Sequence, residues 1–218
     1  HWAVGFLLGF ASLAVVATLA VVAGARELNL AHEPGRFVRH LFNATLSALV
    51  VSILEELIFR GGLFGGLRKS LSWKTALVFS SAVYALVHFF ARPAPPQSVN
   101  WATGIFVLGQ MLRGFADFQT LVPAFLNLLL AGLILGIAFQ RTGSLYMSIG
   151  LHAGWIFWLK SYGFLTRETV GSNVWVWGSG RLIDGWVALF ILFGLFAWIT
   201  GKNRALFSAP ASGRPAEK

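Results

Sequence analysis

Long runs without acidic or basic side chains dominate the chain. Asp, Glu, Lys and Arg are absent from residues 1–25, 40–54, 75–91, 93–112, 118–140, 142–159 and 185–201. About 20 apolar residues are needed for a helix to cross a bilayer, and several of these runs reach or approach that length. The pattern predicts an all-α fold, a polytopic transmembrane helix bundle with about six to seven membrane helices. The predicted spans lie near residues 2–24, 41–67, 75–91, 121–139, 145–160 and 185–200.

The segments between the predicted spans differ in composition. Residues 26–39 carry several charges and a Pro-Gly pair, which is typical of an interfacial loop or a surface helix. Residues 97–117 are apolar but contain polar side chains and glycines, so we expect a re-entrant or interfacial helix there rather than a span. The loop 161–183 is rich in Gly, Ser and Trp and suits the headgroup region. Residues 1–200 are thus predicted to form a single transmembrane domain, and the polar tail 201–218 is predicted to be disordered.

The composition agrees with a multi-pass membrane protein and narrows its partners. Of the 218 residues, 56% are hydrophobic and 11% are charged, against roughly a quarter charged in soluble domains. The net charge is +9, but Lys and Arg lie at the ends of the apolar segments. We therefore expect contacts with membrane lipids, through anionic headgroups, and not with nucleic acid. The basic residues divide equally between the two sides of the predicted topology, which leaves the orientation open. The absence of cysteine excludes disulfides, thiol nucleophiles and cysteine metal ligands.

Three ionisable residues lie in the middle of the predicted span 41–67. Such residues cost roughly 2.5–3.5 kcal/mol each at a helix centre in a bilayer, so they usually face a polar cavity. Glu56 and Arg60 are four positions apart, the spacing of an ion pair on one helix face. Glu55 is rotated about 100° from Glu56 and does not share that face. One interpretation is a buried network of all three residues that joins helices. The other leaves Glu55 available to take a proton from water.

Two histidines lie inside other apolar segments. A lone buried histidine is more often a core residue than a functional one, but the depths of these two match that of Glu55. Glu55 and His88 lie 13 and 14 residues from the two ends of the turn 68–74, or roughly 20 Å along antiparallel helices. His152 reaches the same level if residues 97–117 do not cross the membrane. The spacing therefore predicts that a carboxylate and two imidazoles share one cavity.

The residues around these positions resemble a known family. Residues 55–61 (EELIFRG) match EExxxR, the first motif of the CAAX-protease and bacteriocin-processing (CPBP, or Abi) intramembrane proteases. Residues 84–88 (YALVH) match the second motif, FxxxH, with Tyr in place of Phe. Residues 151–155 (LHAGW) resemble the later histidine motif, and residues 141–145 (RTGSL) are the kind of turn that precedes it.

The resemblance implies a helical membrane protease with a cavity reachable from the membrane. In such an enzyme, Glu55 with His88 would activate the attacking water, and His152 would stabilise the oxyanion. Glu56 and Arg60 would hold the geometry of the site. The substrate would be a membrane-associated peptide or protein, prenylated substrates included.

One position departs from the family pattern. The resemblance covers about residues 40–160, but the last motif usually reads HxxxN, and Ile156 stands where the asparagine is expected, one turn after His152. Isoleucine has no hydrogen-bond donor for an oxyanion. Either part of the oxyanion hole is missing, or Ser148, Asn127 or a backbone amide replaces the asparagine.

The use of a metal is left open by the sequence. The family is labelled a metalloprotease family, yet a glutamate-activated water without a metal is also argued for it. Glu55, His88 and His152 are potential ligands of an open zinc site, although two histidines on separate helices do not form the HExxH arrangement.

Functions without catalysis are the alternatives. A protein of the same fold could serve as an immunity protein, a scaffold or a binder of lipidated peptides. A small transporter is a further alternative, but transporters usually have paired, broken helices in two related halves, which this sequence lacks.

Overall fold

The structure, a computed structural model, describes residues 1–96, 98–116 and 118–201. The predicted disordered tail therefore lies, apart from Gly201, outside the described residues. The elements in chain order are α1 (Trp2–Val22), β1 (Arg26–Leu28), α2 (Pro34–Glu56), η1 (Leu57–Phe64), α3 (Gly65–Leu67), α4 (Trp73–Val87), α5 (Thr103–Leu112), η2 (Arg113–Phe115), α6 (Phe118–Thr142), α7 (Leu145–Leu165), β2 (Thr166–Glu168), α8 (Val174–Trp177) and α9 (Trp186–Thr200).

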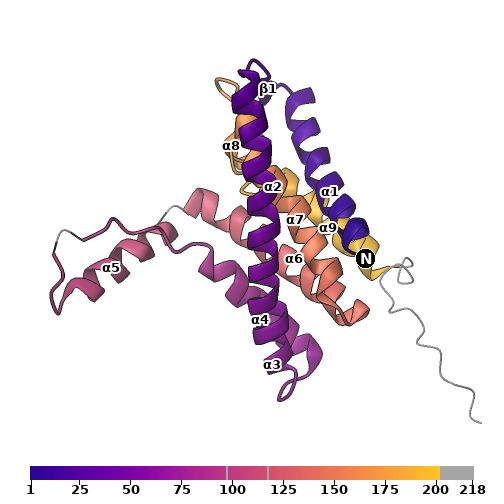
Figure 1. The fold of residues 1–218 in the computed structure, drawn as a ribbon, viewed down its shortest axis with the longest axis vertical. Coiled ribbons are helices and arrows are strands. Elements are labelled where there is room, and N and C mark those ends of the chain that lie inside the picture. Colours follow the sequence, from indigo (N-terminus) through magenta and orange to yellow (C-terminus); the bar gives the residue numbers. More distant parts are fainter. Residues whose placement is uncertain (97, 117, 202–218) are drawn as a thin grey trace, which may run out of the picture.

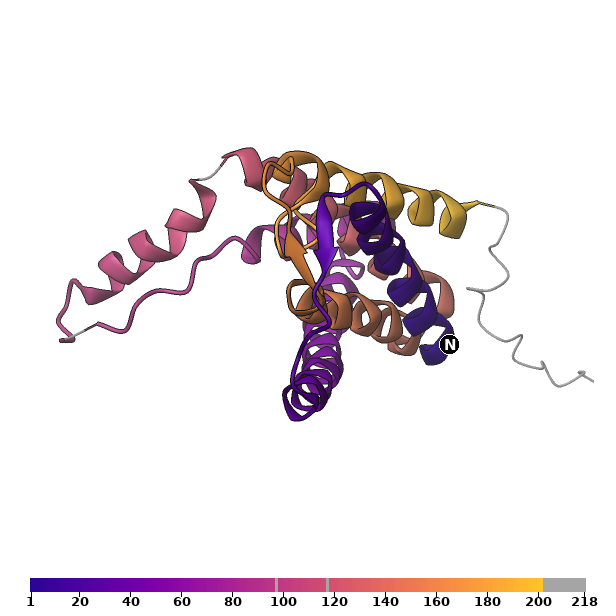
Figure 2. The ribbon, with the colours of Figure 1, turned by 90° about the horizontal axis from the view of Figure 1, so that it is seen from above.

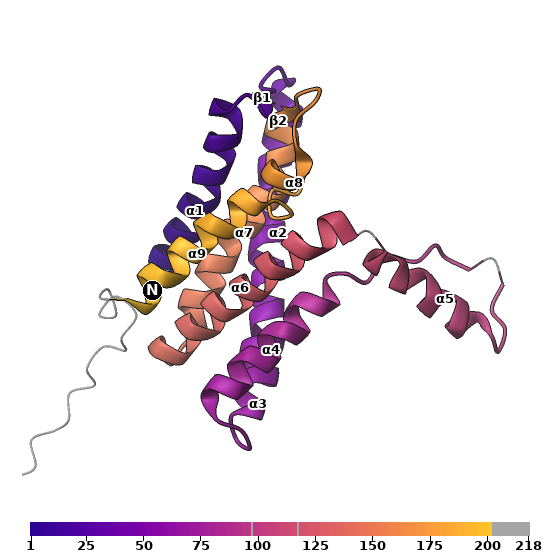
Figure 3. The ribbon, with the colours of Figure 1, turned by 180° about the vertical axis from the view of Figure 1, so that it is seen from behind.

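The predicted all-α membrane bundle is confirmed. Helix α7 lies in the middle and packs against α1, α2 and α6, while α9 packs across α6 and α1 (Figures 1 and 3). Within the described residues, three helices are long and apolar enough to cross a membrane: Trp2–Val22, Pro34–Leu67 and Leu121–Thr142. Helices α4 and α9 have 15 residues each, which is about 22 Å of helix and less than the roughly 30 Å hydrocarbon core.

Glycines bring α1 and α7 into close contact. Each helix carries two glycines four positions apart, Gly5 and Gly9 on α1 and Gly150 and Gly154 on α7. A Cβ atom at Gly9 would lie 2.1 Å from the carbonyl oxygen of Leu151, and one at Gly154 would lie 2.5 Å from a backbone nitrogen of α1. Small residues at this spacing let membrane helices approach to backbone contact.

The helix that contains the acidic residues changes its geometry after Glu56. The spacing of apolar residues predicts a continuous α-helix over 41–67. In the structure the α-helix already begins at Pro34, and Leu57–Phe64 forms a π-helix. Glycines at 61, 62, 65 and 66 remove the side chains that would resist the wider turn. Short π segments occur often at functional sites, and this one contains Arg60.

The expectation of a loop or surface helix over 26–39 and of a loop over 161–183 is only partly right. The strands β1 and β2 pair antiparallel, with Arg26 opposite Glu168, at one end of the bundle (Figure 2). The buried Arg26 side chain donates from Nε to Thr166 Oγ1 at 3.1 Å. Three-residue strands are too short to produce a periodic pattern, so the sequence does not reveal them.

The segment between α4 and α6 forms an arm that stands away from the bundle (Figures 1 and 3). Helix α4 ends at Val87, four residues before the end of the predicted span at residue 91. The base of the arm is closed by the Ala91 amide donating to Met111 O at 2.8 Å, and by the rings of Phe89 and Phe115, 5.8 Å apart.

Candidate active site

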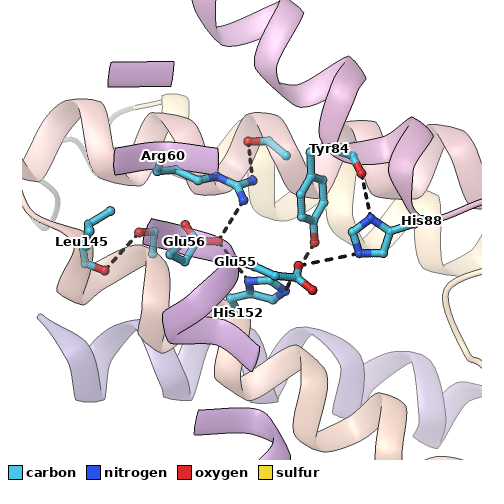
Figure 4. Close-up of polar contacts among 9 residues, drawn as sticks. Glu55, Glu56, Arg60, Tyr84, His88, Leu145 and His152 are labelled. Atoms are coloured by element: carbon cyan, nitrogen blue, oxygen red, sulfur yellow. Dashed lines mark hydrogen bonds and ion pairs between the residues drawn. The ribbon is translucent and has the colours of Figure 1, made fainter. Parts of the chain in front are cut away.

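The residues singled out from the sequence converge at the centre of the bundle. Glu55 and Glu56 end helix α2, Tyr84 and His88 lie at the end of α4, and His152 is in the middle of α7 (Figure 4). The three helices thus bring together motifs separated by up to 97 positions in the chain.

A buried network surrounds Glu56. Its Oε1 atom lies 2.9 Å from Arg60 Nη1 and 2.9 Å from His152 Nδ1. The Glu56 side chain is fully buried, and Arg60 donates a further bond from Nη2 to Gly132 O at 3.2 Å. The spacing of the sequence predicts the pairing of Glu56 with Arg60 but not its contact with His152. One carboxylate therefore fixes a cation on its own helix and an imidazole on α7.

Glu55 has a different environment. Its Oε2 atom is buried and lies 3.7 Å from Nε2 of His88 and 3.7 Å from Nε2 of His152, beyond hydrogen-bond length. The Glu55 side chain is 26% exposed, so the rest of the carboxylate faces the cavity. Glu55 forms no hydrogen bond with any residue in the described part of the chain.

The hydrogen-bond partners assign the tautomers of the two imidazoles. His88 Nδ1 lies 2.7 Å from the carbonyl oxygen of Tyr84, and His152 Nδ1 faces the Glu56 carboxylate. Both partners are acceptors, so each Nδ1 carries a proton, and the Nε2 of a neutral ring then holds a lone pair. The lone pair of His152 accepts from the Tyr84 hydroxyl at 3.3 Å.

A cavity of about 270 Å³ opens beside Glu55. Most of its walls are apolar, with Val51, Trp155 and Ile156 among them. Its polar lining consists of Glu55, Tyr84, His88, Asn127, His152 and Lys160.

Neither side chain expected to replace the missing asparagine offers a free donor to this cavity. Asn127 lines it, but its Nδ2 donates to Pro123 O at 2.9 Å and to Gly185 O at 3.1 Å, which uses both hydrogens. Ser148 donates to Leu145 O at 3.0 Å and does not line the cavity. The Tyr84 hydroxyl was not singled out from the sequence. The only signal for it was the Tyr that occupies the Phe position of the second motif.

The potential zinc ligands of the sequence, Glu55, His88 and His152, lie together at the cavity. Among the residues that the structure describes, no group of three His, Cys, Asp or Glu side chains is placed to hold a metal ion.

The fold and the site together define a membrane-embedded protein with a glutamate and two histidines at a central cavity. Residues 37–158 match the family model of type II CAAX prenyl endopeptidase Rce1-like proteins. This match spans more than half of the chain, so the protein belongs to that family, a family of membrane-embedded proteases, and the resemblance of the motifs is confirmed. No match is found among curated proteins or among solved structures.

Proposed function

We propose that this protein is an intramembrane endopeptidase that hydrolyses a peptide bond of a membrane-associated substrate with water activated by Glu55. The observation that carries the proposal is the placement of the Glu55 carboxylate between two imidazoles at 3.7 Å each, at the wall of a cavity. A carboxylate with no hydrogen bond of its own and a partly exposed side chain is suited to act as a general base.

The two adjacent glutamates have separate roles in this proposal. Glu56 already interacts with Arg60 and His152, and it is fully buried. It cannot reach a water in the cavity without breaking these contacts. Glu55 is therefore the base, while Glu56 and Arg60 hold the geometry of the site.

The histidines orient the reacting groups. His88 is fixed by its bond to the Tyr84 carbonyl and presents Nε2 to Glu55. A water bound between Glu55 and His88 would donate one proton to the carboxylate and the other to the free lone pair of His88. Its oxygen then keeps a lone pair for attack on a carbonyl carbon of the substrate. His152 presents its Nε2 to the same carboxylate oxygen at 3.7 Å.

The walls of the cavity suggest the class of substrate. Apart from the six polar side chains named above, the lining is aliphatic and aromatic, which suits a peptide with apolar side chains. The name of the family refers to CAAX prenyl endopeptidases. The proposed substrates are therefore membrane-associated peptides or proteins, including prenylated ones.

A cleavage assay with the purified protein in lipid vesicles tests the proposal. The substrate is a farnesylated peptide with a fluorophore and a quencher on the two sides of the scissile bond in its C-terminal CAAX sequence, so that cleavage increases the fluorescence. We expect cleavage by the wild type and its loss in Glu55→Gln, which keeps the shape of the side chain and removes the base. Glu27→Gln, an exposed position in β1, is the matched control and should cleave like the wild type. Wild-type turnover in Glu55→Gln would contradict the proposal.

A second function, binding without cleavage, is favoured by Ile156. This residue is buried at the cavity wall and offers no donor to a tetrahedral intermediate. The same vesicles distinguish the two functions. A binder would retain the labelled peptide at saturable occupancy, release no product, and bind equally well after Glu55→Gln.

A further inference from the structure

The cavity lacks an obvious donor for an oxyanion. Ile156 packs with Ala48 and Ala153 and presents only hydrocarbon. The amide of Asn127 is committed to two backbone carbonyls. His152 in its neutral form has its proton on Nδ1, directed at Glu56, and therefore has none on Nε2.

Two donors remain among the described side chains that line the cavity, and only one is close to the reacting groups. Lys160 is eight residues after His152, which places it about 12 Å further along α7. The hydroxyl of Tyr84 lies 3.3 Å from His152 Nε2 and lines the same cavity as Glu55.

Packing holds the Tyr84 ring in one position. The side chain is 3% exposed, and the Arg60 guanidinium carbon lies 4.5 Å from the centre of its ring. Phe59 meets the same ring edge-on at 5.1 Å between ring centroids. These contacts fix the ring and with it the position of the hydroxyl oxygen, so only the O–H bond has to turn during a reaction.

The two departures from the family motifs meet at this point. Tyr84 adds a hydroxyl where the second motif has Phe, and Ile156 removes an amide where the last motif has Asn. Both positions line one cavity. We propose that the Tyr84 hydroxyl is the oxyanion donor of this protein and takes the place of the absent asparagine. The inference rests on the proposed protease function.

The chemical step follows from this assignment. The water oxygen attacks the scissile carbonyl carbon, its proton passes to Glu55, and the electron pair of the C=O bond moves onto the carbonyl oxygen. The Tyr84 O–H turns from His152 Nε2 to that oxyanion and donates a hydrogen bond without giving up its proton. When the C=O bond re-forms, the C–N bond breaks and the leaving nitrogen takes the proton from Glu55.

A cycle of three variants tests the assignment with the vesicle assay. Tyr84→Phe removes only the hydroxyl, and losing one oxyanion donor typically lowers kcat by roughly 10²–10³-fold. We expect that loss with KM nearly unchanged. Adding Ile156→Asn to Tyr84→Phe restores the family pattern at both positions, and we expect it to recover at least about tenfold of the lost rate. Ile156→Asn alone completes the cycle, and its effect on kcat should be smaller in the wild-type background than in Tyr84→Phe, because the hydroxyl already fills the hole.

Tyr162→Phe is the matched control. Tyr162 is fully buried, its hydroxyl has no hydrogen-bond partner among the described residues, and it does not line the cavity. The kcat of Tyr162→Phe should equal that of the wild type. Wild-type kcat in Tyr84→Phe would overturn the inference while leaving the proposed function intact. A loss in Tyr84→Phe that Ile156→Asn does not recover, in a double variant that melts at the wild-type temperature, would also overturn it. Absence of cleavage by the wild type would instead refute the proposed function, and this inference with it.

Discussion

Glu56 is the residue on which the buried polar network depends. A single oxygen of its carboxylate accepts from Arg60 and from His152, both at 2.9 Å. Burying ions is costly, and their mutual attraction offsets the cost only when the geometry is good and the remaining polar atoms are satisfied. Arg60 makes an additional bond to the Gly132 carbonyl, whereas Glu56 Oε2 is buried without a hydrogen-bond partner among the described residues.

Removing the Glu56 carboxylate should therefore destabilise the protein. Glu56→Ala leaves Arg60 as a buried cation without a counter-ion, and breaking such a pair typically costs about 3–5 kcal/mol. The expected result is a lower free energy of unfolding, measured by denaturant titration in detergent micelles. Glu55→Gln, which breaks no hydrogen bond, should unfold like the wild type. Equal stability of Glu56→Ala and wild type would show that the network adds nothing to folding.

The sequence supports only part of this site. The spacing of Glu56 and Arg60 predicts their pairing, because both lie on one helix and its period is known. The contact of His152 with Glu56 is not predictable in this way, because it depends on the rotation of α7 against α2. The role assigned to Tyr84 depends on the same rotation and on the approach of α4. Counting residues along the helices places side chains at one level of the bundle, but it does not show which atoms are in contact.

At the scale of elements, the contact between α1 and α7 supports the site from behind. Gly150 and Gly154 lie on either side of His152 in the chain. Both contact the backbone of α1 closely. Trp155 Nε1 adds a bond to Ser12 Oγ at 2.9 Å across the same contact. The position of the His152 ring thus depends on how closely two helices approach.

A methyl group at this contact should disturb both stability and catalysis. In Gly154→Ala the new Cβ would lie 2.5 Å from the backbone of α1, and overpacking of this kind typically costs about 1–3 kcal/mol. We expect a lower melting temperature and slower cleavage, because α7 must shift. Gly194→Ala is the matched control, since a Cβ there meets no atom within 4 Å. If both variants behaved alike, close packing of α1 on α7 would have no bearing on the site.

The predictability of the elements follows from their length and pattern. The long apolar runs predict α1, α2, α6 and α7, because only a helix satisfies the backbone over such a run in a bilayer. The π-helix at Leu57–Phe64 has the same composition as an α-helix and is not distinguished by periodicity. Helix α5 falls within the segment 97–117, where a re-entrant or interfacial helix was expected, but its 10 residues cover only half of that range.

At the scale of the whole molecule, the arm between α4 and α6 presents apolar side chains that no described part of the protein covers. Trp101 is 93% exposed, and Ile105 and Phe106 on α5 are 70% and 69% exposed. Soluble monomers rarely expose contiguous apolar patches of this kind, which mark contacts with a membrane or a partner. The neighbouring spans and the exposed Trp101 favour the lipid interface. We therefore expect the arm to lie in the membrane rather than in water.

The lack of cysteine in the chain makes this expectation testable, because an introduced cysteine is the only thiol. In open membrane fragments, where both faces are accessible, Ile105→Cys should react slowly with a membrane-impermeant maleimide, since lipid excludes the charged reagent. Lys69→Cys, in the exposed turn after α3, should react fast. Dissolving the membrane in a short-chain detergent and then unfolding the protein should bring the two rates together, which controls for the intrinsic reactivity of each thiol. Equal rates in intact membranes would place the arm in water, and its apolar face would then need a protein partner.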